Sequence, residues 1–493
     1  MSTLKTNNIE HLDATSPSIQ LGIGGGINVS GVVTATSFDG NVTGNVTGNV
    51  TGNINSSGIS TLSNVVVGGG LSVTGVSTFS NTVVGGATTE LVVTGDARIT
   101  GILTVGTASV TLNGTDGTIT GINTINGLTY PSAGALSNRN LIINGAMQVA
   151  QRNTGEVDVS NGSNEGYSTV DRWFLNFNDA VGGGVTFTQS SDAPDDFANS
   201  VKIHTNSTDT TFTTNQYVAL NQRIEAQNLQ LLNYGTSSAR SMTLSWYMKT
   251  TTYTGPISVN LFTDDGTAEY YSVSVTPTTS WARYTLTIPG STSATINDDN
   301  GRGMFLQFVL AGNTSSSIAA SADSTAWSTT RSDFRDDVGN ILSSTDNVFY
   351  LTGVQLEVGT RATLFEHRSY GDELAKCQRY FQTSFTDNPG TGNTSNDGIV
   401  LAGGSTTGNS STFLGPAHIQ LAPNMRAAPT VTIFDLATPR NTGAVHRHTY
   451  GSAGTNNNTA VVTDTNTKSF IVRSDSGASA SGIIFHYQVE AEL

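Results

Sequence analysis

The stretch from Gly40 to Asn53, GNVTGNVTGNVTGN, repeats a four-residue unit that contains no charge and no aromatic ring. Collagen needs glycine at every third position, and Gly, Asn and Thr disfavour helices, so neither a collagen helix nor an amphipathic α-helix fits. Four is twice the period of a strand, which places Val42, Val46 and Val50 on one face of an extended ribbon. One such ribbon buries too little surface to become ordered alone. The repeat therefore predicts strands that need neighbouring copies.

The whole segment 38–135 has this character. Its phrase GISTLSNVVVGG at 58–69 returns as GVSTFSNTVVGG at 75–86. Internal repeats of this kind indicate stacked units that share a core only with their neighbours. We predict an intertwined β shaft built from three chains, a homotrimer in which glycine allows close backbone approach. The alternative is a flexible Gly/Ser-type linker, which would have no use for the regular spacing of Val, Ile and Leu.

Bulk properties exclude several classes of protein. The 493 residues carry a formal net charge of -15, which argues against a nucleic-acid partner. The chain lacks a run of about twenty apolar residues, so we expect no membrane insertion. Its opening lacks the layout of a secretory signal, which predicts synthesis in the cytoplasm of the cell that makes it. A lone Cys377 cannot form an intramolecular disulfide.

Near residue 136 the composition changes, and all four tryptophans lie in the segment 136–368. Alternation becomes explicit in MTLSWYMK at 242–249, where apolar and polar residues take opposite faces. ISVNLF, YYSVSV, RYTLTI, FLQFVL and GVQLEV behave similarly between turn-rich segments. These short strands predict a β-sandwich or jelly roll. We expect Trp173, Trp246 and Trp281 to lie in its core.

The segment 369–383 predicts one helix, with Ser369 as N-cap and an apolar stripe through Tyr370, Leu374, Cys377 and Phe381. Three such helices would form a collar around a trimer axis; alternatively, one helix lies on the sandwich. We expect Cys377 to be a small buried hydrophobe.

The segment 384–493 predicts a second β-sandwich. Its ending, FHYQVEAEL, alternates throughout. We expect every second residue from Phe485, including Val489, to point inward, and every second residue from His486 to Glu492 to point outward. Long polar loops between its strands suit recognition on a rigid scaffold. In total we predict a mostly β, elongated homotrimeric fibre with a shaft, a sandwich, a helix and a distal tip.

Several phrases together resemble tail fibre proteins of tailed bacteriophages, especially phages that infect marine cyanobacteria. They are GNVTGNVTGN, NRNLIINGAMQVAQRNTG, LTGVQLEVGTRATLFEHRSYGDELAKCQRYFQ and MRAAPTVTIFD through HYQVEAEL. The resemblance implies a homotrimer in the virion tail, with residues 1–37 attached to the tail or an adaptor protein. It also implies a distal end that contacts the host surface, with lipopolysaccharide as the expected glycan class. The middle unit is similar to carbohydrate-binding jelly rolls.

Motifs for catalysis are missing from the sequence. Acidic pairs occur at 195–196, 264–265, 298–299 and 336–337, but neighbouring Asp residues on a strand face opposite sides and in turns they cap the backbone. We predict no catalytic residues and no enzyme activity. Clustered Asp oxygens would suit a structural Ca²⁺ better than catalysis.

Candidate binding residues are few. Trp327, in the loop DSTAWSTTR, is either a sugar-binding platform or a loop anchor. In AVHRHTY, His446 and His448 share a face of a strand, so three chains would bring six imidazoles to an axis and could hold a transition metal. The alternatives are merely polar His residues or, with Tyr450, a receptor groove.

The sequence thus predicts a tail fibre that adsorbs to a bacterial surface glycan by multivalent binding. The first alternative is an enzymatic tailspike that cuts surface polysaccharide. The second is a structural spacer with the receptor contact elsewhere.

Overall fold

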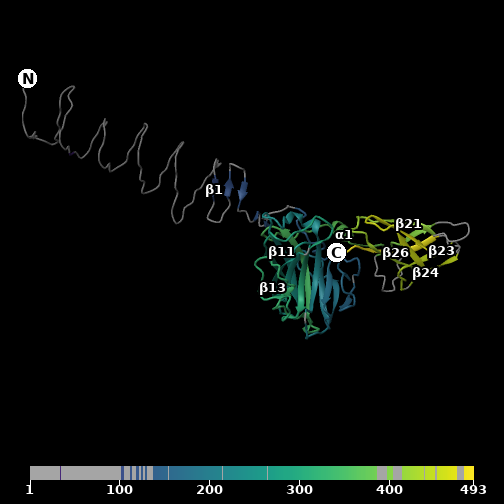
Figure 1. Ribbon diagram of the computed structural model, residues 1–493, viewed down its shortest axis with the longest axis horizontal. Helices are drawn as coiled ribbons and strands as arrows, with labels where there is room; N and C mark the ends of the chain where they lie inside the picture. Colours follow the sequence, from purple (N-terminus) through teal and green to yellow (C-terminus); the bar gives the residue numbers. More distant parts are fainter. Residues whose placement is uncertain are drawn as a thin grey trace, which may run out of the picture. The chain divides into compact units, whose positions relative to one another are not determined.

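The computed structural model describes Thr34, residues 137–153, 155–213, 215–263, 265–385, 397–403, 414–437, 439–449, 452–474 and 482–493, and five short strands before them (Figure 1). These are β1 (Ile102–Thr104), β2 (Thr111–Asn113), β3 (Thr118–Thr120), β4 (Thr124–Ile125) and β5 (Leu128–Thr129). β1, β2 and β3 form one antiparallel sheet, and β4 pairs with β5. The GNVT repeat, the attachment segment 1–37 apart from Thr34, and Tyr450 lie outside the described residues.

The segment after residue 136 forms a two-sheet β-sandwich, so the prediction of a mostly β fold is confirmed. The five-stranded sheet has the order β13 (Glu269–Val275), β12 (Ile257–Thr263), β15 (Arg302–Gly312), β10 (Tyr217–Glu225), β7 (Phe174–Asn178). The six-stranded sheet has the order β14 (Ala282–Ile288), β11 (Met242–Thr250), β18 (Val348–Val358), β9 (Ser200–Ser207), β8 (Gly184–Ser190), β6 (Val157–Ser160). Shorter elements between them are η1 (Ala226–Leu232), β16 (Ala319–Ala320), β17 (Phe334–Arg335) and η2 (Ile341–Ser343).

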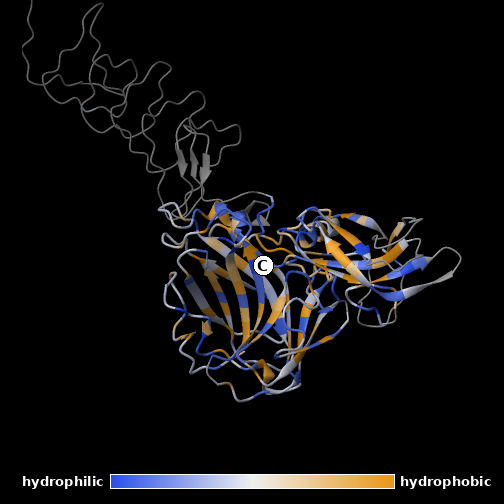
Figure 2. Cartoon of the chain, turned by 45° about the vertical axis from the view of Figure 1, so that its right-hand side comes forward, coloured by the Kyte–Doolittle hydropathy of each residue, from blue (hydrophilic) through white to orange (hydrophobic). Residues whose placement is uncertain are grey.

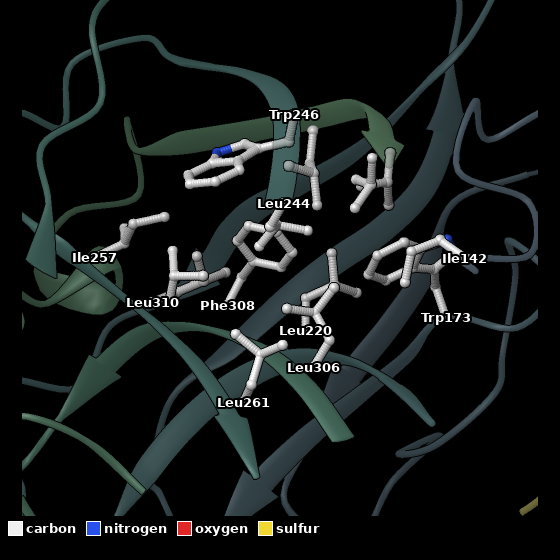
Figure 3. Close-up of a cluster of buried hydrophobic side chains, with 14 of the residues drawn as sticks. Ile142, Trp173, Leu220, Leu244, Trp246, Ile257, Leu261, Leu306, Phe308 and Leu310 are labelled. Atoms are coloured by element: carbon white, nitrogen blue, oxygen red, sulfur yellow. The ribbon is translucent and has the colours of Figure 1, made fainter. Parts of the chain in front are cut away.

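Apolar side chains from both sheets fill the sandwich interior. Phe308 of β15 lies 5.7 Å from Trp246 of β11 and 6.3 Å from Trp173, measured between ring centroids (Figure 3). Trp246 is 1% exposed and Trp173 is fully buried, which confirms their predicted core positions. Trp173 also donates its indole N–H to the Asn144 carbonyl at 3.1 Å. Figure 2 shows apolar and polar residues alternating along these strands, because successive side chains point to opposite faces.

The helix α1 (Tyr370–Gln378) begins as predicted, with the Ser369 hydroxyl accepting from the Asp372 amide at 3.2 Å. Its buried face differs from the predicted stripe. Tyr370 is 57% exposed, whereas Glu373 is buried beside Cys377 because its carboxylate accepts from the Asn144 amide of the sandwich. This contact agrees with the alternative in which the helix lies on the sandwich; a trimer collar stays a prediction.

An eight-stranded sheet follows the helix. Its order is β19 (Phe381–Thr383), β26 (Gly482–Glu490), β23 (Ala444–Thr449), β24 (Ser452–Thr463), β25 (Ser469–Ser474), β21 (Leu414–Gln420). Two further strands, β20 (Val400–Gly403) and β22 (Thr430–Phe434), also pair with β26. A separate apolar core lies under it, built around Val445, Phe470 and Phe485.

The final strand β26 follows the predicted alternation on its inward side, where Phe485 and Val489 are fully buried. On the outward side the prediction is wrong for two residues. His486 is fully buried with its ring 5.6 Å from that of Phe385, and the Glu492 side chain is 7% exposed. Alternation assigns a residue to a face, but it cannot show that a second segment covers that face.

A network of buried charges joins the sandwich to the end of the chain. Glu492 forms ion pairs with Arg172 and, at 3.0 Å, with Arg152. The Arg172 guanidinium also lies 3.5 Å from the centroid of the Tyr380 ring. Both guanidinium groups are nearly buried, so their charges need the Glu492 carboxylate as a partner.

No helix in the described part of the chain combines the length and apolar character needed to cross a bilayer.

We expect Phe308→Ala to lower the free energy of unfolding of the sandwich by about 3–5 kcal/mol, because it removes the ring that contacts both core tryptophans. Chemical denaturation followed by tryptophan fluorescence measures this loss. Tyr370→Ala is the control, since the loss of this exposed ring should change the free energy of unfolding by less than about 0.5 kcal/mol. Equal denaturation midpoints for Phe308→Ala and the parent would contradict the central position of Phe308 in the core.

We expect Glu492→Ala to lower the free energy of unfolding by about 3–5 kcal/mol, because it leaves the Arg172 charge buried without a carboxylate. Limited proteolysis should then cleave between the sandwich and the last sheet at lower protease concentration. Glu490→Ala is the matched control: this carboxylate also pairs with Arg152 but is 40% exposed. A protease sensitivity of Glu492→Ala no greater than that of Glu490→Ala would show that the buried pair does not hold the junction.

Candidate functional site

The candidate site is a cleft on the outward face of the five-stranded sheet, with a volume of about 320 Å³. We call it the outer cleft. Its floor is formed by alternate residues of β7, β10, β12, β13 and β15, whose other phase fills the core. It is lined by Phe174, Asn176, Asn178, Tyr217, Arg223, Phe262, Tyr270, Arg302, Phe305, Gln307, Arg331 and Asp333.

Aromatic rings run across three neighbouring strands of this floor. Phe262 of β12 is stacked against Phe305 of β15, with centroids 4.7 Å apart and ring planes 19° apart. On its other side it is stacked against Tyr270 of β13 at 5.6 Å and 30°. The strand register aligns these three residues, since Phe262 is the partner of both Tyr270 and Phe305. Phe174 of β7 meets Phe305 edge to face at 5.7 Å.

One wall of the outer cleft is a long excursion between β15 and β18. Its residues Ile318, Phe334 and Val338 pack on Ala219 and Val309, which belong to the outward face of the sheet. The sheet is therefore covered at one end and open at the other. The open part retains the aromatic rings, and the excursion supplies polar groups at the rim.

The rim carries an ion pair between Arg331 and Asp333. Arg331 donates to both carboxylate oxygens of Asp333, at 3.0 and 2.6 Å. Burial, with the Asp333 charge nearby, raises the pKa of Tyr217 to about 12, so this phenol stays protonated at neutral pH. Burial and the same carboxylate also raise the pKa of Tyr270. Both phenols can therefore donate hydrogen bonds as well as accept them.

Two further arginines flank the aromatic floor. The Arg302 guanidinium lies 5.3 Å from the centroid of Phe305, and that of Arg223 lies 5.4 Å from it. Burial first, and then the Arg223 charge, lower the pKa of Arg302. Arg223 also donates to the main-chain oxygen of Leu493.

The outer cleft combines the apolar edges of a row of stacked rings with directional polar groups. A pyranose ring offers an apolar face of C–H groups and a rim of hydroxyls, so its C–H face can lie against the ring edges of Phe262 and Tyr270 while its hydroxyls meet the arginine, carboxylate and amide groups. Asp333 is the single carboxylate among the described residues that line this cleft.

Trp327 lies against the sandwich core and does not line the outer cleft. Its indole N–H donates to the Pro289 carbonyl at 2.7 Å, and its ring centroid lies 5.8 Å from those of Tyr234 and Tyr271. Its ring is partly buried against the core. These contacts support the loop-anchor alternative, and the sugar-binding role of Trp327 stays a prediction.

The prediction that Trp281 lies in the core is wrong. It precedes β14 on the outward phase of that strand, and its indole N–H donates to the Asp192 carboxylate at 3.1 Å. Lys249 donates to the same carboxylate, and its ammonium lies 5.3 Å from the Trp281 ring centroid. Burial would raise the pKa of Asp192, but the hydrogen bonds from Lys249 and Trp281 outweigh it and lower that pKa.

His446 and His448 lie on β23, and Nδ1 of His446 is 2.7 Å from the Asn456 side-chain oxygen. Within the described residues, no group of three or more His, Cys, Asp or Glu side chains is placed to hold a metal ion. The predicted transition-metal site needs imidazoles from three chains, so it stays a prediction, as do the receptor role of these residues and of Tyr450 and the structural Ca²⁺.

One residue of each of two acidic pairs accepts from a backbone amide, as expected for Asp in turns. Asp265 accepts from the Asn297 amide at 2.7 Å, and Asp299 accepts from the Gly301 amide at 2.7 Å. A carboxylate engaged with backbone N–H groups in this way stabilises the turn.

The outer cleft was not identified from the sequence, although a signal was present. In ISVNLF, Phe262 falls on the polar phase with Ser258 and Asn260 instead of the apolar phase. Phe305 and Tyr270 likewise occupy the outward phase of their strands. An aromatic residue on the solvent phase of a sandwich strand marks a surface ring, and three neighbouring strands that share this feature mark a platform.

No protein-family model matches the chain, and no curated protein matches its sequence. Among solved structures it is similar to the enzymatically active domain of tailspike protein 4 of bacteriophage CBA120, with a TM-score of 0.22 and 15% identity over 41% of this chain and 21% of that one. The chain thus spans about a fifth of that tailspike chain.

It is also similar to a family 11 carbohydrate-binding module of a cellulase of Clostridium thermocellum, with a TM-score of 0.23 and 15% identity over 43% of this chain and 98% of that one. A xylan-binding domain from Paenibacillus barcinonensis gives a TM-score of 0.20 and 8% identity over 38% of this chain and 87% of that one. TM-scores this low carry no argument about function.

The surface position of Trp281 has a measurable consequence. We expect acrylamide to quench part of the tryptophan fluorescence, and we expect Trp281→Phe to remove most of this quenchable part, because Trp173 and Trp246 are buried. Trp327→Phe is the comparison, since its ring is partly buried. Unchanged quenching in Trp281→Phe would show that Trp281 is shielded from the quencher, as the sequence predicted.

Proposed function

We propose that the chain is a phage tail fibre protein whose sandwich binds a bacterial surface glycan in the outer cleft. The observation that carries the proposal is the stacked row of Tyr270, Phe262 and Phe305 on an outward sheet face, with arginine and carboxylate groups beside it. The sequence resemblance to tail fibres supplies the virion setting and the lipopolysaccharide class of receptor.

Adsorption by such a fibre rests on repeated weak contacts. A shallow aromatic platform makes few hydrogen bonds to any one sugar, so we expect modest affinity at each site. In a homotrimer attached to the tail by its N-terminal segment, each fibre would carry three outer clefts. Linking several sites raises the overall avidity without any new contact.

The enzymatic tailspike is the second candidate. Hydrolysis of a glycosidic bond needs two carboxylates about 5–10 Å apart across the sugar. Among the described residues of the outer cleft, Asp333 is the one carboxylate, and both of its oxygens accept from Arg331. This geometry favours binding without cleavage. The structural spacer would leave the aromatic row without a role.

We expect the full chain to be retarded in affinity gels that contain bacterial lipopolysaccharides or neutral polysaccharides, and Phe262→Ala to bind about tenfold more weakly, or about 1.4 kcal/mol. The variant removes the middle ring of the aromatic row and its apolar contact, while the strand remains. Tyr370→Ala, whose exposed ring lines no part of the outer cleft, should migrate like the parent.

Two results would count against the proposal. Equal retardation of Phe262→Ala and the parent would move the glycan elsewhere, and an unretarded parent would favour the spacer. New reducing ends released from the polysaccharide during incubation would identify a tailspike enzyme instead of a binding fibre.

A further inference from the structure

A second aromatic cleft lies on the opposite sheet of the sandwich. It has a volume of about 360 Å³ and is lined by Asp196, Phe197, Tyr247, Leu364, Phe365 and His367. We call it the second cleft. Tyr247 lies on the outward phase of β11, whose inward residues Trp246 and Met248 are in the core. The two clefts therefore use outward faces of different sheets.

The rings of the second cleft form a cluster centred on Phe197. Its ring centroid lies 5.3 Å from Tyr247, 5.0 Å from Phe365 and 5.1 Å from His367. None of these rings is in the sandwich core, and the neighbouring Leu364 is 52% exposed. Apolar side chains grouped in a surface hollow favour a ligand with an apolar face.

The backbone of β18 is adapted to hold these rings. Its register against β11 shifts between Ser245 and Tyr247, which is a β-bulge, and Gly353 within it has a φ of +61°. A Cβ at Gly353 would lie 2.8 Å from ring atoms of both Phe197 and Tyr247. Only glycine fits this conformation and this contact without displacing a ring. Bulges of this kind often re-aim side chains at functional sites.

Polar groups at the edge of the second cleft define the kind of ligand. Asp196 precedes Phe197 and has a φ of +72°, an unusual conformation for a residue with a side chain. Its exposed carboxylate has no hydrogen-bond or ion-pair partner among the described residues, so its oxygens are available as acceptors. The exposed imidazole of His367 stands on the same hollow.

We infer that the second cleft is a second carbohydrate site, in which one sugar ring stacks on Tyr247 and Phe365 while its hydroxyls donate to Asp196. A hexose or pentose matches both features, because it presents an apolar C–H face and hydroxyl donors. The inference rests on the proposed function for the choice of a glycan as ligand. Each chain then carries two glycan sites on opposite sheets and bridges two surface glycan strands.

The test uses the full chain and four proteins: the parent, Phe262→Ala for the outer cleft, Tyr247→Ala for the second cleft, and the double variant. The probes are xylotetraose, cellotetraose and tetrasaccharides released from lipopolysaccharide, titrated by calorimetry. We expect two sites per chain in the parent, one site of parental affinity in each single variant and none of parental affinity in the double variant. Asp196→Asn should bind about tenfold more weakly at the second cleft, and Tyr247→Phe, which keeps the ring, should retain it.

Each other outcome decides between the two ideas. One site in the parent, lost in Phe262→Ala and kept in Tyr247→Ala, overturns this inference and leaves the proposed function intact. One site in the parent, lost in Tyr247→Ala and kept in Phe262→Ala, supports the second cleft as a glycan site and overturns the assignment of the outer cleft. Absence of binding to all probes overturns both. Circular dichroism confirms folding, and Phe365→Leu replaces Tyr247→Ala if that variant unfolds.

Light scattering tests whether the second cleft is an interface between copies of the chain instead of a glycan site. If Leu364→Asp lowers the mass of the assembly, the second cleft is an interface between copies of the chain, and the carbohydrate assignment is overturned. An unchanged mass together with loss of one glycan site supports it.

Discussion

The packing of two sheets around Phe308 and the core tryptophans is the constraint on which the rest of the structure depends. Each strand gives one phase of its side chains to this interior, so the interior fixes which residues face outward. Phe262 and Tyr247 are consequently held on opposite outer surfaces by rigid strands. Side chains on strands are held more firmly than side chains on a loop, so the positions of these rings are well defined.

The outward faces differ in what covers them. A long excursion with Phe334 covers one end of the five-stranded sheet and leaves the aromatic row open. At the junction with the last sheet, the Glu492 carboxylate pairs with Arg172 and Arg152 in nearly buried surroundings, and Arg152 also pairs with Asp171. Breaking such a pair leaves an unpaired buried charge, so the loss of Glu492 is expected to weaken the docking of the final residues.

The tryptophans and the aromatic row of the outer cleft show how much the sequence could predict. Trp246 and Trp281 both sit in alternating stretches, yet one is in the core and the other pairs with Asp192 at the surface. Trp246 shares the phase of its apolar neighbours Leu244 and Met248, whereas Trp281 precedes its strand and shares the phase of the exposed Arg283. Phe262 lies among the polar residues of its strand, so the sequence could have predicted its surface position. That it meets Tyr270 and Phe305 depends on the strand register, which the sequence does not give.

The sequence by itself determined the mostly β fold, the sandwich strands, the capped helix at Ser369 and the inward phase of the last strand. These follow from period-two alternation and local hydrogen bonds, which act over a few residues. The tertiary structure alone decided which outward residues meet in clefts and which, such as His486 and Glu492, become buried. Those outcomes depend on segments far apart in the chain, whose pairing sets strand register and covers or exposes each face.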